Sequence, residues 1–423
     1  MQITRRTLLG VGTGTVAALA AAGCGVGAAP SASTPGSLRA TWWGGDSENG
    51  ALNAALDRYT ERTGLQVQRE SLPWDGYWDK LATQTAARNA PDLIMQAGSQ
   101  IPDYADRGAL LDLSSLSDLD PSVVDEGLRS FGAVEDQLFG VVAAANATGL
   151  VSSDEVVEEA GITVPEQAWS WDELAELADE AHRGLGDDRW GVADAGGDLI
   201  AFILYVRDSG KEFYADDGTL NATPEELTAW LTLWHELRAS GGAPPPDVTA
   251  EGAGSLPSSP LGQHRVAMGL AWTQDFVALA ALDDRPRSIS LPPHSTENPS
   301  LWMNAASLWS VSATSPSSAA AGELISYLLT DTEAITDLGV RLGMPPTQAA
   351  RDQLAGSLDP APQAAMDYMS LVATTSRPLN RLWPSGFAEL RTLLSEINEA
   401  VAFESSSISA GVEQFFQAAE SGE

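Results

Sequence analysis

Tryptophan is the residue type in this sequence whose chemistry is most informative. The chain of 423 residues contains 13 tryptophans, against 9 phenylalanines and 7 tyrosines. The flat face of an indole suits the C–H face of a pyranose ring, and the ring N–H donates a hydrogen bond. Several tryptophans fall at predicted strand ends or in irregular segments, where they can face a cleft: Trp42, Trp43, Trp272, Trp302, Trp309 and Trp383. This set predicts a site that stacks aromatic side chains on a sugar-like ring.

Other tryptophans are better explained by packing. Trp230 and Trp234 share one helical face with Leu227 and Leu231, which is the pattern of a buried helix stripe. Trp78 and Trp171 also fall on or beside predicted helix faces, so we interpret them as structural.

Polar residues at similar positions could bind the hydroxyl groups of such a ring. Planar amide, carboxylate and guanidinium groups provide fixed donors and acceptors for hydroxyls. The candidates are Asp46, Gln96, Asn146, Asp194 and Arg341. Asp46 follows the first predicted strand, and Gln96 ends the third. Arg341 is explained equally well by a salt bridge between two lobes.

Motifs for metal or cofactor chemistry are not found in the sequence. The four histidines are scattered, without the spacing of a zinc site. The sequence also lacks a nucleophile elbow, a phosphate-binding P-loop and a dinucleotide fingerprint. We therefore predict no metal, no cofactor and no catalytic residue. The 58 acidic residues offer many carboxylate pairs by chance, so glycoside hydrolysis by a secreted carbohydrate-active enzyme stays open as an alternative.

The elements that must position these residues alternate between strand and helix. Residues 38–46 predict a strand ending at two glycines, and 65–70 and 93–95 predict two more strands. Helical apolar patterns lie between them. This order requires parallel pairing with right-handed crossovers. Ligands of such sheets bind beyond the carboxyl ends of the strands, where Trp43, Asp46 and Gln96 fall.

Length and charge narrow the class of protein. A chain of 423 residues exceeds what one hydrophobic core serves, so we expect two lobes. The formal net charge is −35, which disfavours binding to nucleic acid or to anionic lipid head groups.

The N-terminus predicts export and anchoring. Residues 1–23 have the charged, apolar and small-residue regions of a signal peptide. Arg5 and Arg6 resemble a twin-arginine signal, and the run that ends at Cys24 resembles a lipobox. Cys24 is the only cysteine, so we predict that it is lipidated and that residues 24–37 form a tether. The protein would then lie on the extracellular face of the cell membrane. An incidental cysteine in a secreted chain is the alternative.

Longer motifs resemble a known family. They are WWGG at 42–45, WDGYWDKLATQTAARNAPDLI at 74–94, YADRGALLDLS at 104–114, EAGITVPEQAWSWDELAELA at 159–178 and GVRLGMPP at 339–346. Together they resemble the family 1 extracellular solute-binding proteins, the receptors of carbohydrate ABC importers. This sequence has Val142 where that family usually has a proline before the crossing between lobes.

The resemblance implies an α/β, two-lobed periplasmic-binding-protein-like fold with discontinuous lobes joined by a hinge. It implies that 38–145 and 266–329 form lobe I, and that 146–265 and 330–423 form lobe II. The implied function is capture of a sugar or oligosaccharide by a monomer that delivers it to the permease subunits of an ABC transporter. A receptor for a non-sugar solute such as a polyol phosphate is a further alternative, which the acidic composition disfavours.

Overall fold

The computed structural model describes residues 37–421 except 167, 253–254, 381–382 and 385. The predicted signal peptide, Cys24 and the tether up to residue 36 lie outside the described residues. Within the described part of the chain, no helix combines the length and the apolar character needed to cross a bilayer.

The first sheet is built around three parallel strands near the N-terminus. Its first five elements are β1 (Ser37–Trp43), α1 (Asp46–Thr63), β2 (Gln66–Leu72), α2 (Trp74–Ala86) and β3 (Leu93–Gln96). β1 pairs in parallel with both β2 and β3, which confirms the predicted strand–helix alternation. Two later strands, β6 (Val141–Asn146) and β11 (Asn304–Val311), complete the order β2-β1-β3-β11-β6, with β11 antiparallel to its neighbours.

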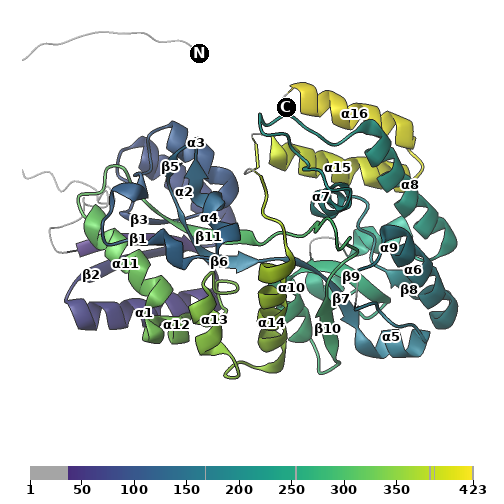
Figure 1. Ribbon diagram of the computed structural model, residues 1–423, viewed down its shortest axis with the longest axis horizontal. Helices are drawn as coiled ribbons and strands as arrows, with labels where there is room; N and C mark the ends of the chain where they lie inside the picture. The colour runs from purple at the N-terminus through teal and green to yellow at the C-terminus, as the bar shows by residue number, and fades with distance from the viewer. Residues whose placement is uncertain (1–36, 167, 253–254, 381–382, 385, 422–423) are drawn as a thin grey trace, which may run out of the picture. The chain divides into compact units, whose positions relative to one another are not determined.

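Helices cover both faces of this sheet, as Figure 1 shows for α1 and α2. Alternate residues of β3 pack against the helices on opposite faces of the sheet. Leu93 and Met95 pack in the core cluster that includes Leu52 of α1, whereas Ile94 packs with Tyr77 of α2. The strand is therefore apolar without alternation because both of its faces are buried.

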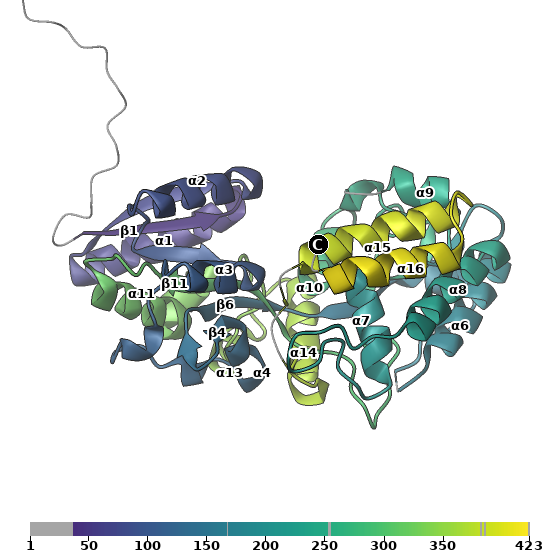
Figure 2. The same cartoon turned by 90° about the horizontal axis from the view of Figure 1, so that it is seen from above.

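The second sheet has the order β10-β7-β9-β8. Its strands are β7 (Thr148–Ser153), β8 (Trp190–Val192), β9 (Val266–Trp272) and β10 (Arg287–Ser290). The helices that accompany it are α5 (Asp154–Ala160), α6 (Trp171–Leu185), α7 (Leu199–Asp208), α8 (Pro224–Ser240), α9 (Pro246–Glu251), α10 (Thr273–Ala280), α14 (Pro360–Thr375), α15 (Phe387–Ala402) and α16 (Ile408–Ser421). α15 and α16 lie side by side and contact α8 (Figures 1 and 2).

The remaining elements are short or lie near the first sheet. They are α3 (Ile101–Asp106), α4 (Glu126–Arg129), the hairpin β4 (Ala133–Val134) and β5 (Gln137–Leu138), α11 (Ser318–Thr330), α12 (Thr332–Leu338) and α13 (Gln348–Leu354). α12 packs against α1 and against its neighbours α11 and α13.

Two predicted lobe boundaries do not coincide with the strand pairing. Residues 266–290 include β9 and β10, which pair with β7 of the second sheet rather than with the first sheet. Residues 332–338 form α12, which packs on α1, whereas the second lobe was expected to begin at residue 330. A local pattern identifies a strand or a helix, but the partner it packs against depends on contacts far away in sequence.

Local sequence patterns account for two features of helices α6 and α8. Ser170 and Glu173 form a reciprocal capping box at α6, and Thr223 and Glu226 form one at α8. Trp230 and Trp234 are both 0% exposed, as their helical spacing predicts.

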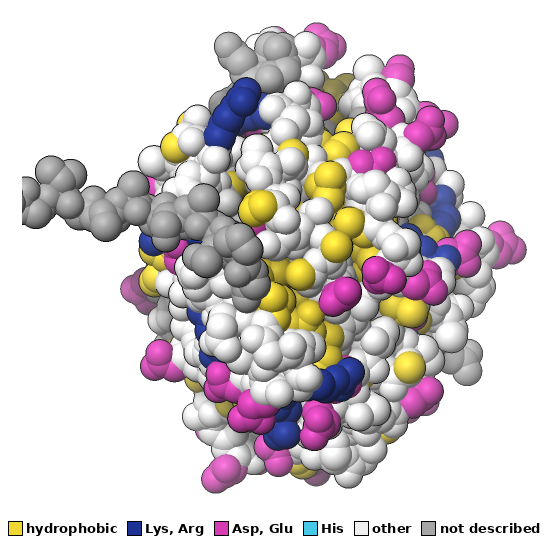
Figure 3. Space-filling view, turned by 90° about the vertical axis from the view of Figure 1, so that its left-hand side faces the viewer, with side chains coloured by type: hydrophobic (Ala, Val, Ile, Leu, Met, Phe, Trp, Pro, Cys, Tyr) yellow, Lys and Arg dark blue, Asp and Glu magenta, His cyan; other side chains and the backbone are white. Residues whose placement is uncertain are grey.

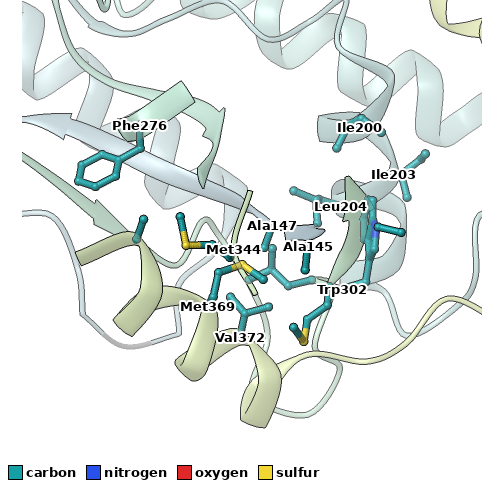
Figure 4. Close-up of a cluster of buried hydrophobic side chains, with 14 of the residues drawn as sticks. Ala145, Ala147, Ile200, Ile203, Leu204, Phe276, Trp302, Met344, Met369 and Val372 are labelled. Carbon is teal, nitrogen blue, oxygen red and sulfur yellow. The ribbon is translucent and has the colours of Figure 1, made fainter. Parts of the chain in front are cut away.

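The chain passes from one sheet to the other at Ala147, between β6 and β7. Thr273 donates its backbone N–H to the carbonyl oxygen of Ala147 at 3.0 Å. Small and flexible side chains surround this passage: Figure 4 shows Ala145 and Ala147 near Met344, and all three belong to one buried cluster. Val142, at the position where a proline was expected, lies inside β6 opposite Leu308. Val142 is therefore a sheet residue, and unlike proline it has a backbone N–H.

The loop GVRLGMPP is explained by close backbone packing at the same place. Met344 and Ala145 exchange two backbone hydrogen bonds of 2.8 and 2.9 Å. Gly343, with a φ of +122°, lies so close that an added Cβ would be 3.1 Å from Cβ of Ala144. Only glycine meets both requirements without strain.

Acidic side chains do not form one patch on the face of the molecule that Figure 3 shows. Asp and Glu side chains are dispersed there among neutral and basic ones. Some surface arginines are paired, as Arg58 is with Asp337 at 2.6 Å. We therefore interpret the acidic side chains on this face as solvated charges and not as one binding patch.

Candidate functional site

A cavity of about 940 Å³ lies at the carboxyl ends of β1 and β3, where the sheet topology predicts a ligand. Residues from both sheets and their helices line it. They come from the end of β1, the start of α2, the loop 97–100, the end of β6, the β9–α10 junction, the start of β11, the loop 342–343 and the exposed face of α15. The volume is near the upper end of the ~300–1,000 Å³ typical of pockets for drug-sized molecules.

One wall of the cavity is a cluster of aromatic rings on the first sheet. The rings of Trp43 and Trp74 meet edge to face, with centroids 5.0 Å apart. Tyr77 and Trp78 pack behind Trp43, at centroid distances of 5.4 and 5.6 Å. Trp74 is 50% exposed, so a large part of its ring is free to contact a solute.

Trp74 was not among the residues predicted from the sequence. It is the first residue of α2, directly after Pro73, which has extended backbone angles and starts the helix at the carboxyl end of β2. Its position after a predicted strand was the signal that could have identified it.

Other aromatic residues line the cavity from the second sheet and its helices. Trp272 ends β9 and precedes the first turn of α10. Trp383 stacks on Phe387, the first residue of α15, with centroids 4.3 Å apart and the planes inclined by 15°. Trp43, Trp272 and Trp383 are thus the predicted cleft tryptophans that the cavity brings together.

The other three predicted cleft tryptophans are buried instead. Trp42 is 1% exposed, and Trp302 and Trp309 are each 2% exposed. The indole N–H of Trp42 donates to Oδ1 of Asn49 at 2.8 Å. Trp42 and Trp43 are adjacent in a strand, so their side chains point to opposite faces and only one can reach the cavity.

Trp302 and Trp309 are buried for different reasons. Trp309 pairs with Met95 in register, so both side chains lie on the core face of the sheet. Trp302 packs beneath Trp383, with centroids 5.8 Å apart, and the guanidinium of Arg207 lies 5.6 Å from its ring. It supports the cavity wall rather than forming it.

A chain of three amides lies in the cavity near the passage between the sheets. Asn304 Nδ2 donates to Oδ1 of Asn146 at 2.9 Å, and Asn146 Nδ2 donates to Oε1 of Gln274 at 3.1 Å. Asn146 was a sequence candidate, whereas Gln274 and Asn304 were not. Because the amides orient one another, their remaining donors and acceptors are fixed for a polar solute.

Gln96, Asp194, Asp46 and Arg341 are the predicted polar residues that do not line this cavity. Gln96 is 0% exposed, and its side-chain amide has no hydrogen-bond partner among the described residues. Asp194 forms a buried ion pair of 2.6 Å with Arg238, an arrangement that favours a structural role. Asp46 is exposed in the first turn of α1. Arg341 lines a separate pocket of about 90 Å³ beside Trp43.

Helix α15 contributes the charged side chains of the cavity, Arg391 and Glu396, together with Thr392 and Ser395. Sequence patterns do not indicate these residues, because α15 lies more than three hundred residues after β1 in the chain and its apolar stripe gives no indication of what its polar face contacts.

One titratable group borders the cavity without lining it. Asp198 caps α7, and its Oδ1 accepts a hydrogen bond of 2.9 Å from the backbone N–H of Ile200, a lining residue. Burial raises the pKa of Asp198, while the backbone hydrogen bond and the charge of Arg391 oppose that rise.

No group of three or more histidine, cysteine, aspartate or glutamate side chains that could hold a metal ion occurs in the part of the chain that the structure describes.

Comparison with known proteins identifies the family. The sequence profile of the bacterial extracellular solute-binding proteins matches residues 54–373. An uncharacterized lipoprotein of Streptomyces antibioticus is 25% identical over 229 residues, which are 52% of this chain and 50% of that protein. The chain spans about half the length of the curated relatives that it matches.

Solved structures share the fold. A family 1 extracellular solute-binding protein from Alicyclobacillus acidocaldarius is 24% identical, with a TM-score of 0.76 over 92% of this chain and 98% of that chain. A periplasmic oligogalacturonide-binding protein from Yersinia enterocolitica is 20% identical, with a TM-score of 0.77 over 91% and 98%. The fold is therefore the two-lobed one that the sequence motifs predict, and the profile match over most of the chain shows that this protein belongs to the bacterial extracellular solute-binding proteins.

Proposed function

We propose that the protein captures a sugar or short oligosaccharide in the cavity and delivers it to an ABC importer. The observation that carries the proposal is the placement of tryptophans on elements of both sheets, Trp43 and Trp74 from one side and Trp272 and Trp383 from the other. Indole faces bind the C–H faces of pyranose rings, and the fixed amides supply partners for hydroxyls.

The lobes would close on the sugar by rotation about the passage at Ala147 and the neighbouring connections between the sheets. Closure of this kind buries a ligand between two lobes. Ala145 and Ala147 at the passage have only methyl side chains, which place little bulk in the way of a rotation. We expect the protein to act as a monomer and to present its closed form to a permease.

The related proteins support this reading. The Yersinia protein is named for oligogalacturonide binding and has also been solved with saturated digalacturonic acid. The Streptomyces antibioticus relative is called a lipoprotein, in keeping with lipidation at Cys24 and anchoring on the extracellular face after export by the twin-arginine route.

Thermal-shift screening of the purified protein against a panel of mono- and oligosaccharides tests the proposal. A sugar that binds only the folded state adds roughly 2.7 kcal/mol of stability at ~100 times its dissociation constant. At least one sugar should raise the melting temperature in a concentration-dependent way. A panel of common plant, microbial and storage oligosaccharides that leaves the melting temperature unchanged throughout would contradict sugar binding.

Chromatography of the stabilising sugar after long incubation separates a receptor from a carbohydrate-active enzyme. A receptor returns its ligand unchanged, so no new species should form. Appreciable cleavage or transfer products would show that the protein is an enzyme.

A further inference from the structure

The charges that line the cavity are few and balanced. Arg391 and Glu396 are the charged residues among the described side chains of the lining, and both project from α15. Both are exposed, and neither has a hydrogen bond or an ion pair with another described residue. Their polar atoms are therefore available to a solute.

The charge of Arg391 interacts with a carboxyl group of the protein itself. The charge of Arg391 acts on Asp198 at the N-terminus of α7. The Asp198 side chain accepts the hydrogen bond of the Ile200 backbone N–H. The first turn of α7, a position that could otherwise hold an anion, is thus occupied by a group of the protein itself.

The rest of the lining is neutral. It consists of indole and phenyl rings, the side-chain amides of Gln100, Asn146, Gln274 and Asn304, serine and threonine hydroxyls, and aliphatic residues and glycines. An acidic solute would exchange its hydration for contact with one arginine, whose charge already interacts with Asp198, within a protein of net charge −35. Partial desolvation of an anion without matching positive charge opposes binding.

A hydroxyl group matches the same surroundings well. It donates one hydrogen bond and accepts others, so the hydroxyls of one sugar can donate to Glu396 and accept from Arg391. The cavity volume of about 940 Å³ lies at the upper end of the ~300–1,000 Å³ of sites for drug-sized molecules, which favours a solute larger than a single sugar ring.

We propose that the solute is an uncharged oligosaccharide of more than one ring and that Glu396 is the residue that discriminates against acidic sugars. This inference rests on the proposed function and names the class of sugar. It sets this chain apart from the oligogalacturonide-binding protein of the same fold.

Calorimetric titration of the purified protein tests the inference with neutral and acidic probes of matched length. The neutral probes are trisaccharides of glucose, xylose, mannose and galactose in α and β linkages, and the acidic probe is trigalacturonate. We expect one or more neutral trisaccharides to bind on the order of tenfold more tightly than trigalacturonate, since one unfavourable charge contact has about this effect. The affinity for the neutral sugar should change little between ~0.05 and ~0.5 M NaCl, since no charge on the ligand is screened.

The substitution Glu396→Gln tests the residue. It keeps an acceptor oxygen and removes the charge, so it should raise the affinity for trigalacturonate about tenfold and leave that for the neutral sugar within about threefold. Glu399→Gln, on the same helix but outside the lining, is the matched control and should change neither affinity.

The outcomes separate the two proposals. Trigalacturonate that binds as tightly as every neutral probe overturns the inference and leaves a sugar receptor in place. An unchanged trigalacturonate affinity in Glu396→Gln overturns the role of Glu396. Failure of all probes, acidic and neutral, overturns sugar binding together with the inference.

Discussion

Trp43 and Trp74 meet edge to face at the rim of the cavity, with ring centroids 5.0 Å apart. Trp43 is held by Tyr77 and Trp78 behind it, whereas Trp74 is half exposed. The ring of Trp43 is thus fixed by packing, whereas the ring of Trp74 is largely free. Substitution of Trp74 can therefore weaken solute binding without destabilising the fold.

Truncation of Trp74 should weaken solute binding without unfolding the protein. Loss of an aromatic anchor can cost about 2 kcal/mol of binding free energy, roughly thirtyfold in affinity. Calorimetric titration and melting curves of Trp74→Ala, Trp272→Ala and Trp383→Ala should show weak binding and a near-normal melting temperature. The control is Trp234→Ala, because a fully buried tryptophan costs ~3–5 kcal/mol of folding free energy when truncated. Normal affinity in all three cavity variants would place the solute elsewhere.

Removal of the side chain of Gln274, the last of the three hydrogen-bonded amides, should reduce the affinity for the solute modestly. Gln274 is exposed and accepts a hydrogen bond from Asn146. Gln274→Ala removes a polar contact to the solute and frees Asn146 to rotate, so we expect a loss of about 1 kcal/mol in binding free energy. Titration with the solute that the screen identifies measures this loss. The melting temperature should stay close to that of the unmodified protein, and a large drop would mean that Gln274 acts in folding.

Asp194 should prove structural. Its carboxylate and the guanidinium of Arg238 are both nearly inaccessible to solvent and 2.6 Å apart. Removal of one partner of a buried pair leaves the other charge unpaired, which typically costs ~3–5 kcal/mol of folding free energy. Chemical denaturation of Asp194→Asn should show this loss, while the folded protein binds its solute normally. A variant that is stable but cannot bind would restore Asp194 as a ligand residue.

His264 should make stability depend on pH near neutrality. Burial and the adjacent charge of Arg287 lower the pKa of His264 below its ordinary 6.5, and a hydrogen bond with Asp283 only partly opposes this. The unfolded state then binds the proton more readily than the folded state. The contribution to stability is full above pH 6.5 and is lost as the pH falls below that value.

Melting curves of the protein and of His264→Asn between about pH 8 and pH 5 measure this dependence. Asparagine tolerates the positive φ of +55° at this position. The decrease in melting temperature on acidification should be smaller in the variant. Because both proteins share all other titrating groups, including Asp283 and Arg285, an identical decrease would contradict the role of His264.

Cys24→Ser should release the protein from the cell. If Cys24 carries the lipid, the variant loses its anchor and appears in the medium with unchanged solute affinity. Ser31→Ala in the same tether is the control and should stay with the membrane fraction. Retention of Cys24→Ser in membranes after a salt wash would rule out lipidation at this residue.

The sequence by itself determined the features that depend on local pattern. The alternation of strand and helix in the first hundred residues required a parallel sheet, and the capping boxes at Ser170 and Thr223 marked two helix starts. Helical spacing identified Trp230 and Trp234 as core residues. The longer motifs identified the family, and the topology indicated the edge of the sheet at which the cavity lies.

Only the tertiary structure decided which side chains share the cavity. Trp42 and Trp43 are equal candidates in sequence, but the pleat of β1 sends one into the core and the other to the rim. Trp309 is buried because its register with Met95 fixes the face on which it lies. Arg391 and Glu396 reach the cavity from a helix near the C-terminus, and their meeting with Trp43 depends on long-range packing that no local pattern encodes.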